Sequence, residues 1–192
     1  MALVVLGIAA VQAEEILANL DEKAPTEGVL LSFENGQDAA SWGWYRNTSG
    51  LREIGQSFTA TADGKLKALT LKIHNVRSDF TADLEFTVRL YETQNISQNP
   101  DTGRLLSTQK GTLRLSKGHE GWYLAFNLAE PVPLQVGVVY TFVLAWDAPA
   151  AFNTVSFVTN TGYPEGKRWF SEDPDSGSLQ AIGRQSLVFY VQ

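Results

Sequence analysis

An alternation of large and small side chains in residues 121–146, GWYLAFNLAEPVPLQVGVVYTFVLAW, most constrains the fold of this chain. Side chains two apart in a strand lie on the same face of a sheet, so each half predicts a strand with one core-facing side. Pro131, Pro133 and Gly137 separate the halves, because proline continues neither a helix nor a strand ladder. The bulky residues that share one face are Trp122, Leu124, Phe126 and Leu128 in the first half and Tyr140, Phe142, Leu144 and Trp146 in the second.

The same period of two recurs from Ile54 onward. It is clearest in residues 84–90, where Leu, Phe, Val and Leu alternate with Glu, Thr and Arg. No long amphipathic helical pattern follows residue 28. The chain is therefore predicted to be all-β, with two antiparallel sheets packed face to face in a jelly-roll-like β-sandwich. Other predicted strands, separated by turn-forming residues, are 29–33, 54–58, 69–73, 105–106, 113–115, 155–157 and 186–192.

Composition divides the chain into three parts. Residues 1–13, MALVVLGIAAVQA, are almost wholly apolar and are typical of the hydrophobic and cleavage regions of a secretory signal, although no basic leader precedes them. The alternative is a disordered or non-native start; the run is too short to span a bilayer. Residues 14–28 are polar and predict a short helix or a leader linker, and residues 29–192 predict one β-sandwich domain. We therefore expect a secreted protein, extracellular or periplasmic.

Charge and cysteine content exclude several classes of function. The formal net charge of −6 argues against the basic surface that nucleic-acid binding needs, and no polybasic run favours an anionic membrane. The chain has no cysteine, so it can form no disulfide, thiolate metal site or cysteine nucleophile. Hydrophobic residues at 44% and charged residues at 19% are typical of a globular protein.

The order of six short segments resembles a known family. The segments are GQSFT (55–59), KALTL (67–71), VRLY (88–91), WY through VPL (122–134), Gly137 with YTF (140–142), and LVFY (187–190). They resemble the bacterial extracellular β-sandwich domains called choice-of-anchor R, over residues 54–192. The resemblance implies a secreted, jelly-roll-like, non-catalytic module. The chain departs from anchored members in that Gln192 ends the last predicted strand, with no hydrophobic tail or sorting motif after it.

Residues 41–47, SWGWYRN, form the first candidate site. Trp42, Trp44 and Tyr45 offer flat rings that can cover the apolar face of a sugar, and Arg46 can bind its hydroxyl groups. The alternative is that the two tryptophans, two residues apart, are core residues of a strand.

Residues 163–170, YPEGKRWF, form the second candidate site. Tyr163, Arg168 and Trp169 could line an edge of the same groove, because loops on a rigid sheet scaffold often carry binding residues. The alternative is an end loop that Trp169 and Phe170 hold against the core. Trp122 and Trp146, inside alternating strands, are predicted to be core residues.

No cofactor or catalytic group is indicated by a motif. The turns NPDTG (99–103) and DPDSG (173–177) offer oxygen ligands, but neither supplies the six to eight oxygens that calcium takes. They are interpreted as solvated turns, and a structural calcium ion assembled from several loops stays open. His74 and His119 have no partner motif, whereas a pair of catalytic carboxylates, being spatial, stays open among 21 acidic residues.

The sequence thus predicts an exported, non-catalytic module that binds a polysaccharide or cell-surface glycan. The first alternative is a structural or adhesion module with a protein partner. A polysaccharide-degrading enzyme is the second alternative.

Overall fold

The computed structural model describes residues 15–34, 40–47, 50–147, 153–172, 178–182 and 185–192. Within these residues the chain forms strands and two short 3₁₀ helices and no α-helix, which confirms the all-β prediction. No helix in the described ranges has the length and apolar character needed to cross a membrane. The elements are β1 (Ile16–Asp21), β2 (Leu31–Phe33), β3 (Ala40–Asn47), β4 (Gly50–Thr59), β5 (Gly64–Val76), β6 (Leu84–Thr93), η1 (Pro100–Thr102), β7 (Arg104–Leu113), η2 (Lys117–His119), β8 (Tyr123–Leu134), β9 (Val139–Trp146), β10 (Asn153–Thr161), β11 (Arg168–Ser171), β12 (Gln180–Ile182), β13 (Gln185–Leu187) and β14 (Phe189–Val191).

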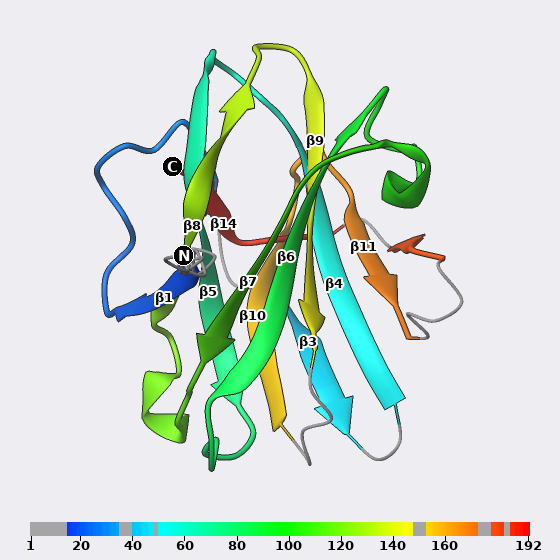
Figure 1. Ribbon diagram of the computed structural model, residues 1–192. Helices are drawn as coiled ribbons and strands as arrows, with labels where there is room; N and C mark the ends of the chain where they lie inside the picture. Colours follow the sequence, from blue (N-terminus) through cyan, green and yellow to red (C-terminus); the bar gives the residue numbers. More distant parts are fainter. Residues whose placement is uncertain (1–14, 35–39, 48–49, 148–152, 173–177, 183–184) are drawn as a thin grey trace, which may run out of the picture.

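The sheet closes into a barrel (Figure 1). In the described part of the chain, nine strands pair in the ring β4-β9-β6-β7-β1-β8-β5-β10-β3 and back to β4. The pairing of β10 with β5 and of β3 with β4 completes the ring. The prediction of an open two-sheet, jelly-roll-like sandwich was therefore wrong. Alternation predicts which face of a strand is buried, but a sandwich and a barrel both bury one face of each strand. The pattern therefore does not distinguish the two architectures.

Aromatic side chains fill the interior of the barrel. Trp44 from β3 stacks on Trp146 from β9, with ring centroids 3.8 Å apart and an interplanar angle of 9°. Phe86 and Phe126 pack edge-on against Trp44, each with its ring centroid 6.1 Å away. Residues 84–90 and 140–146 are strands as predicted, and their alternate bulky residues lie in this core.

Residues 14–28, predicted to be a helix or a linker, contribute a strand to the barrel. β1 lies between β7 and β8, parallel to the first and antiparallel to the second. Ile16 is buried in the core, and Gly111 of β7 lets its backbone approach, because a Cβ at Gly111 would lie 2.6 Å from the Ile16 carbonyl oxygen. The polar residues of β1 face outward, which is why the segment resembled a solvated linker.

Two short strands extend the sheet beyond β4 on one side of the barrel. β11 pairs with β4, and β12 pairs with β11, although residues 163–170, which include most of β11, were predicted to form a loop. These strands bring Trp169 and Leu179 against Val143 of β9 and Tyr91 of β6, in a buried cluster that is separate from the barrel core. β9 is consequently buried on both faces, where alternation alone predicted one.

Candidate ligand-binding site

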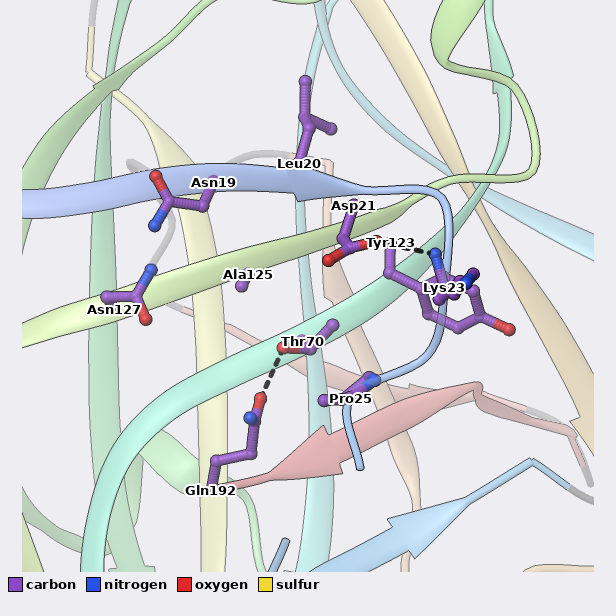
Figure 2. A pocket seen from close by; sticks show the side chains of 10 residues that line it. All are labelled: Asn19, Leu20, Asp21, Lys23, Pro25, Thr70, Tyr123, Ala125, Asn127 and Gln192. Carbon is purple, nitrogen blue, oxygen red and sulfur yellow. Dashed lines mark hydrogen bonds between the residues drawn. The ribbon is translucent and has the colours of Figure 1, made fainter. Parts of the chain in front are cut away.

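A polar pocket lies on the outer face of the barrel, where β1, β8, β5 and the C-terminus meet (Figure 2). Its volume is about 200 Å³. Most of its side chains can donate or accept hydrogen bonds, and few are apolar. The lining residues are Asn19, Leu20, Asp21, Lys23, Pro25, Thr70, Tyr123, Ala125, Asn127 and Gln192.

Strand register explains why the surface is hollow here. Asn19 of β1 lies opposite Ala125 of β8, and Ala125 lies opposite Thr70 of β5. Directly paired residues in neighbouring strands point to the same face of a sheet. The methyl group of Ala125 therefore forms a low floor between two longer polar side chains, and Asp21 and Tyr123 face each other in the neighbouring row.

Hydrogen bonds fix part of the pocket and leave part of it free. The Asn127 Nδ2 group donates to the Leu17 carbonyl oxygen at 2.9 Å, and the Thr70 hydroxyl donates to Gln192 Oε1 at 2.7 Å (Figure 2). Within the described ranges the side chains of Asn19 and Lys23 form no hydrogen bond or ion pair. The pocket thus combines oriented polar groups with an amide and an ammonium that a ligand can engage.

A carboxylate holds the tyrosine on the wall of the pocket. The Tyr123 hydroxyl donates to Glu34 Oε1 at 2.8 Å, Tyr190 donates to Oε2, and Lys72 Nζ lies 3.1 Å from Oε1. Burial raises the pKa of Glu34, but these three hydrogen bonds outweigh it and hold the pKa below its usual value. Burial and the bond to Glu34 raise the pKa of Tyr123, so its phenol stays neutral.

Two of the sequence-predicted binding residues are sealed inside the protein. Trp44 is 0% exposed in the barrel core, and Trp169 is 2% exposed in the separate cluster with Val143, Tyr91 and Leu179. The Trp169 Nε1 group donates to Ser57 Oγ at 2.6 Å, and its strand passes Gly55, which leaves room for the indole. Neither ring reaches solvent to stack on a sugar. Trp44 is a core residue of a strand, as its alternative stated, whereas Trp169 packs on the barrel from strand β11 and not from an end loop.

Three other predicted residues come together around an arginine that the sequence analysis missed. Trp42 and Tyr45 of β3 and Arg168 of β11 meet Arg52 of β4. The Arg52 guanidinium carbon lies 4.6 Å from the Trp42 ring centroid and 4.8 Å from that of Tyr45. The Arg168 guanidinium carbon lies 4.1 Å from the Trp42 centroid, and Phe170 packs edge-on against Trp42 at 5.6 Å. We call Trp42, Tyr45, Arg52, Arg168 and Phe170 the arginine–aromatic cluster.

The two arginines of this cluster differ in their partners. Arg52 forms an ion pair with Glu172 through Nη2. Arg168 is 5% exposed, and its Nε and Nη1 atoms have no hydrogen-bond partner in the described part of the chain. Burial, with a smaller contribution from Arg52, lowers the pKa of Arg168 to about 10, so its guanidinium still carries a full charge at neutral pH.

The remaining predicted residues lie elsewhere. Tyr163 lines a separate pocket of about 530 Å³ with Pro164 and Lys167, and its ring packs against Phe33 at 5.0 Å. Burial raises the pKa of Tyr163 to about 12. The side chain of Arg46 lies outside the described residues.

Trp122 and Trp146 were predicted to be core residues. Trp146 is buried, whereas Trp122 is half-buried beside His119.

Of the two turns interpreted as solvated, the one at residues 99–103 is described, and its polar side chains bond to the backbone. Asp101 accepts a hydrogen bond from the Leu179 backbone at 3.1 Å, and Asn99 caps η1 through a bond from the Asp101 backbone. Residues 173–177 lie outside the described ranges. Among the described residues, no group of three or more His, Cys, Asp or Glu side chains is placed to hold a metal ion.

Comparisons with known proteins assign no family. No protein-family model and no curated protein matches the sequence, so the resemblance to choice-of-anchor R domains stays a prediction. A solved structure of the cysteine protease and lectin-like domains of Cwp84, a surface layer associated protein of Clostridium difficile, is similar with a TM-score of 0.44 and 11% identity. The match covers 82% of this chain, which spans 36% of that chain. A similarity this distant carries no argument about function.

Proposed function

We propose that the protein is an exported, non-catalytic β-barrel module that binds a carbohydrate in the polar pocket between β1, β8 and β5. The observation that carries this proposal is the row formed by Asn19, Ala125 and Thr70, in which polar side chains flank a low floor. Sugars present many hydroxyl groups, each a donor and an acceptor, and the amide, carboxylate and hydroxyl groups of this pocket match that pattern.

The size of the pocket favours a small part of a glycan. Its volume of about 200 Å³ lies below the range of about 300–1,000 Å³ typical of pockets for drug-sized ligands. One sugar residue, as a chain end or a side branch, suits this space better than a longer oligosaccharide. The Tyr123 ring, held by Glu34, supplies an apolar wall beside the polar groups.

Export is part of the proposal and is supported by the apolar run of residues 1–13. The alternative of a protein-binding adhesion module would need an extended apolar surface. In the described residues, the large exposed apolar side chains are Leu17, Leu105 and Val136, which lie on β1, on β7 and in the turn before β9. Single exposed apolar residues are ordinary on protein surfaces, so the pocket supports the carbohydrate function better.

Isothermal titration calorimetry against a panel of neutral and acidic glycans tests the proposal. For the glycan that binds best, Asn19→Ala should weaken affinity about five- to tenfold, because one hydrogen-bonding amide is lost. Ala125→Leu should abolish binding by raising the floor. Asn75→Ala, which alters an exposed asparagine on β5, is the matched control and should bind normally. Binding to no glycan, or equal affinity of all variants, would overturn the proposal.

A further inference from the structure

We propose that the arginine–aromatic cluster is a second binding site, which takes an oxyanion such as a carboxylate or sulfate group beside Arg168. The cluster lies across the barrel from the polar pocket, because β8 and β4 are on opposite sides of the ring of strands. Figure 1 shows β1 and β8 on the left of the barrel and β11 on the right. This site is therefore independent of the proposed carbohydrate pocket.

A fork in the sheet creates the site. One edge of β4 pairs with β3 at residues 50–52 and then with β11 at residues 53–56. Arg168 lies opposite Gln56, and Phe170 lies opposite Ile54, whose side chain is in the barrel core. Paired residues share a face, so Arg168 and Phe170 face the inner side, where the diverging strand β3 presents Trp42.

The charges of the cluster do not balance within the described residues. Glu172 neutralises Arg52, but none of the described ion pairs includes Arg168. A buried guanidinium without a counter-ion is unfavourable, and the neighbouring positive charge of Arg52 adds to the cost. The face of the Trp42 ring offsets part of this cost through a cation–π interaction. One positive charge remains for a ligand to neutralise.

The unsatisfied atoms show what kind of ligand fits. The buried polar atoms of the cluster without a partner are Arg168 Nε and Nη1, Arg52 Nε and Trp42 Nε1. All four are hydrogen-bond donors, so they call for a ligand that only accepts hydrogen bonds. An oxyanion carries several lone pairs and the negative charge that Arg168 lacks, whereas a metal cation or a neutral donor meets neither need.

Such an oxyanion can be free in solution or belong to an acidic sugar, and the two sources share the same chemistry. Tyr45 and Phe170, both half-buried at the cluster, provide ring surface beside the charge. A uronic acid would use both the arginine and the rings, whereas inorganic sulfate would use the arginine alone. Comparing sulfate, acetate and a uronate at equal ionic strength distinguishes the two sources.

Tryptophan fluorescence and thermal unfolding of the full chain test the site. With chloride as the reference at constant ionic strength, sulfate, acetate or galacturonate should give a saturable change in fluorescence and a rise in Tm. Tighter binding of galacturonate than of acetate would identify an acidic sugar as the ligand. Equal binding would identify a simple anion.

Arg168→Met should remove the saturable response, and Arg114→Met, which alters an exposed arginine, should leave it intact. Asn19→Ala should also leave it intact, so that failure of the carbohydrate pocket and failure of this site are distinguishable. Should Arg168→Met not fold, Trp42→Phe replaces it, because it removes one donor and keeps an aromatic ring; about tenfold weaker binding is then expected. A change in fluorescence and Tm that rises linearly with salt concentration, and is equal in all variants, would reflect the general exclusion of salt from the protein surface. That result would overturn the proposal.

Discussion

Trp42 and Trp44 lie two residues apart on β3, yet they have very different surroundings. Trp44 stacks on Trp146 in the barrel core and is 0% exposed. Trp42 is half-buried, with the guanidinium groups of Arg52 and Arg168 at 4.6 and 4.1 Å from its ring. Both positions pair with β10, Trp44 with Val155 and Trp42 with Phe157. The difference arises on the other edge of β3, which leaves β4 where β11 takes its place.

The comparison shows that period-two spacing predicts on which face of a strand a side chain lies. It does not predict which residues that side chain contacts. The same residue type on the same face becomes a core residue where the barrel is closed and a partner of arginines where the sheet forks. A tryptophan-rich segment can therefore contribute to the core and to a surface site at the same time.

Replacing each tryptophan by alanine should separate the two environments most strongly. Trp44→Ala should lower the free energy of unfolding by about 3–5 kcal/mol, because it leaves a large cavity in a close-packed core. Trp42→Ala should cost about 2 kcal/mol or less, since it removes a half-buried ring and cation–π contacts. Urea denaturation followed by circular dichroism measures both. Equal losses would contradict the distinction between a closed core and an open fork.

Adding a methyl group near the fork should sharpen the distinction. Gly55→Ala should destabilise the protein by about 1–3 kcal/mol, because its Cβ would lie 2.6 Å from the Phe142 carbonyl oxygen. Gly43→Ala on β3 is the matched control, with its nearest neighbour, Tyr45 Cδ1, at 3.5 Å. The control should change stability by less than about 0.5 kcal/mol. A tolerated Gly55→Ala would show that β4 and β9 do not approach each other as closely at Gly55 as the distance to the Phe142 carbonyl oxygen indicates.

The hydroxyl group of Ser57 on β4 joins β11 and β9, through Trp169 and Thr141, and both of its hydrogen bonds can be removed by one substitution. Ser57→Ala deletes the acceptor of the Trp169 Nε1 group and the hydrogen bond to Thr141 at 2.9 Å. The free energy of unfolding should fall by about 1–2 kcal/mol, because a buried indole N–H is left without a partner. Ser156→Ala, on an exposed hydroxyl with a long contact of 3.5 Å, should be nearly neutral in the same denaturation experiment.

A pH series should show a smaller effect beside the polar pocket. The pKa of Glu34 is lowered in the folded protein, so its contribution to stability is present above the usual pKa of 4.5 and is lost as the pH falls through the folded value. Wild type should thus exceed Glu34→Gln in Tm at pH 7, and the difference should shrink below pH 4.5. A difference that is constant with pH would show that ionised Glu34 does not anchor Tyr123 and Tyr190.

Much of the architecture could be predicted from local pattern. The alternation in residues 84–90 and 140–146 gave the correct strands because it depends only on neighbouring residues. Barrel closure could not be predicted, since the pairing of Val155 with Val76 joins strands that are far apart in the sequence.

The candidate sites were predicted in part. Aromatic and arginine content marked Trp42 and Arg168, but Arg52 lies in an ordinary strand segment and gave no local signal. The polar pocket was missed because residues 14–28 were interpreted as a helix or linker, although Ile16, Ala18 and Leu20 alternate with polar Asn19 and Asp21. That alternation was the available signal.

The indole N–H resonances in a ¹H–¹⁵N spectrum, recorded in chloride and then in sulfate, test the central claim most directly. The claim is that the closed barrel seals Trp44 while the fork leaves Trp42 beside an unneutralised arginine. We predict a saturable shift of the Trp42 resonance, with slow hydrogen exchange and no shift for Trp44. Equal shifts for both tryptophans, or rapid exchange at Trp44, would contradict it.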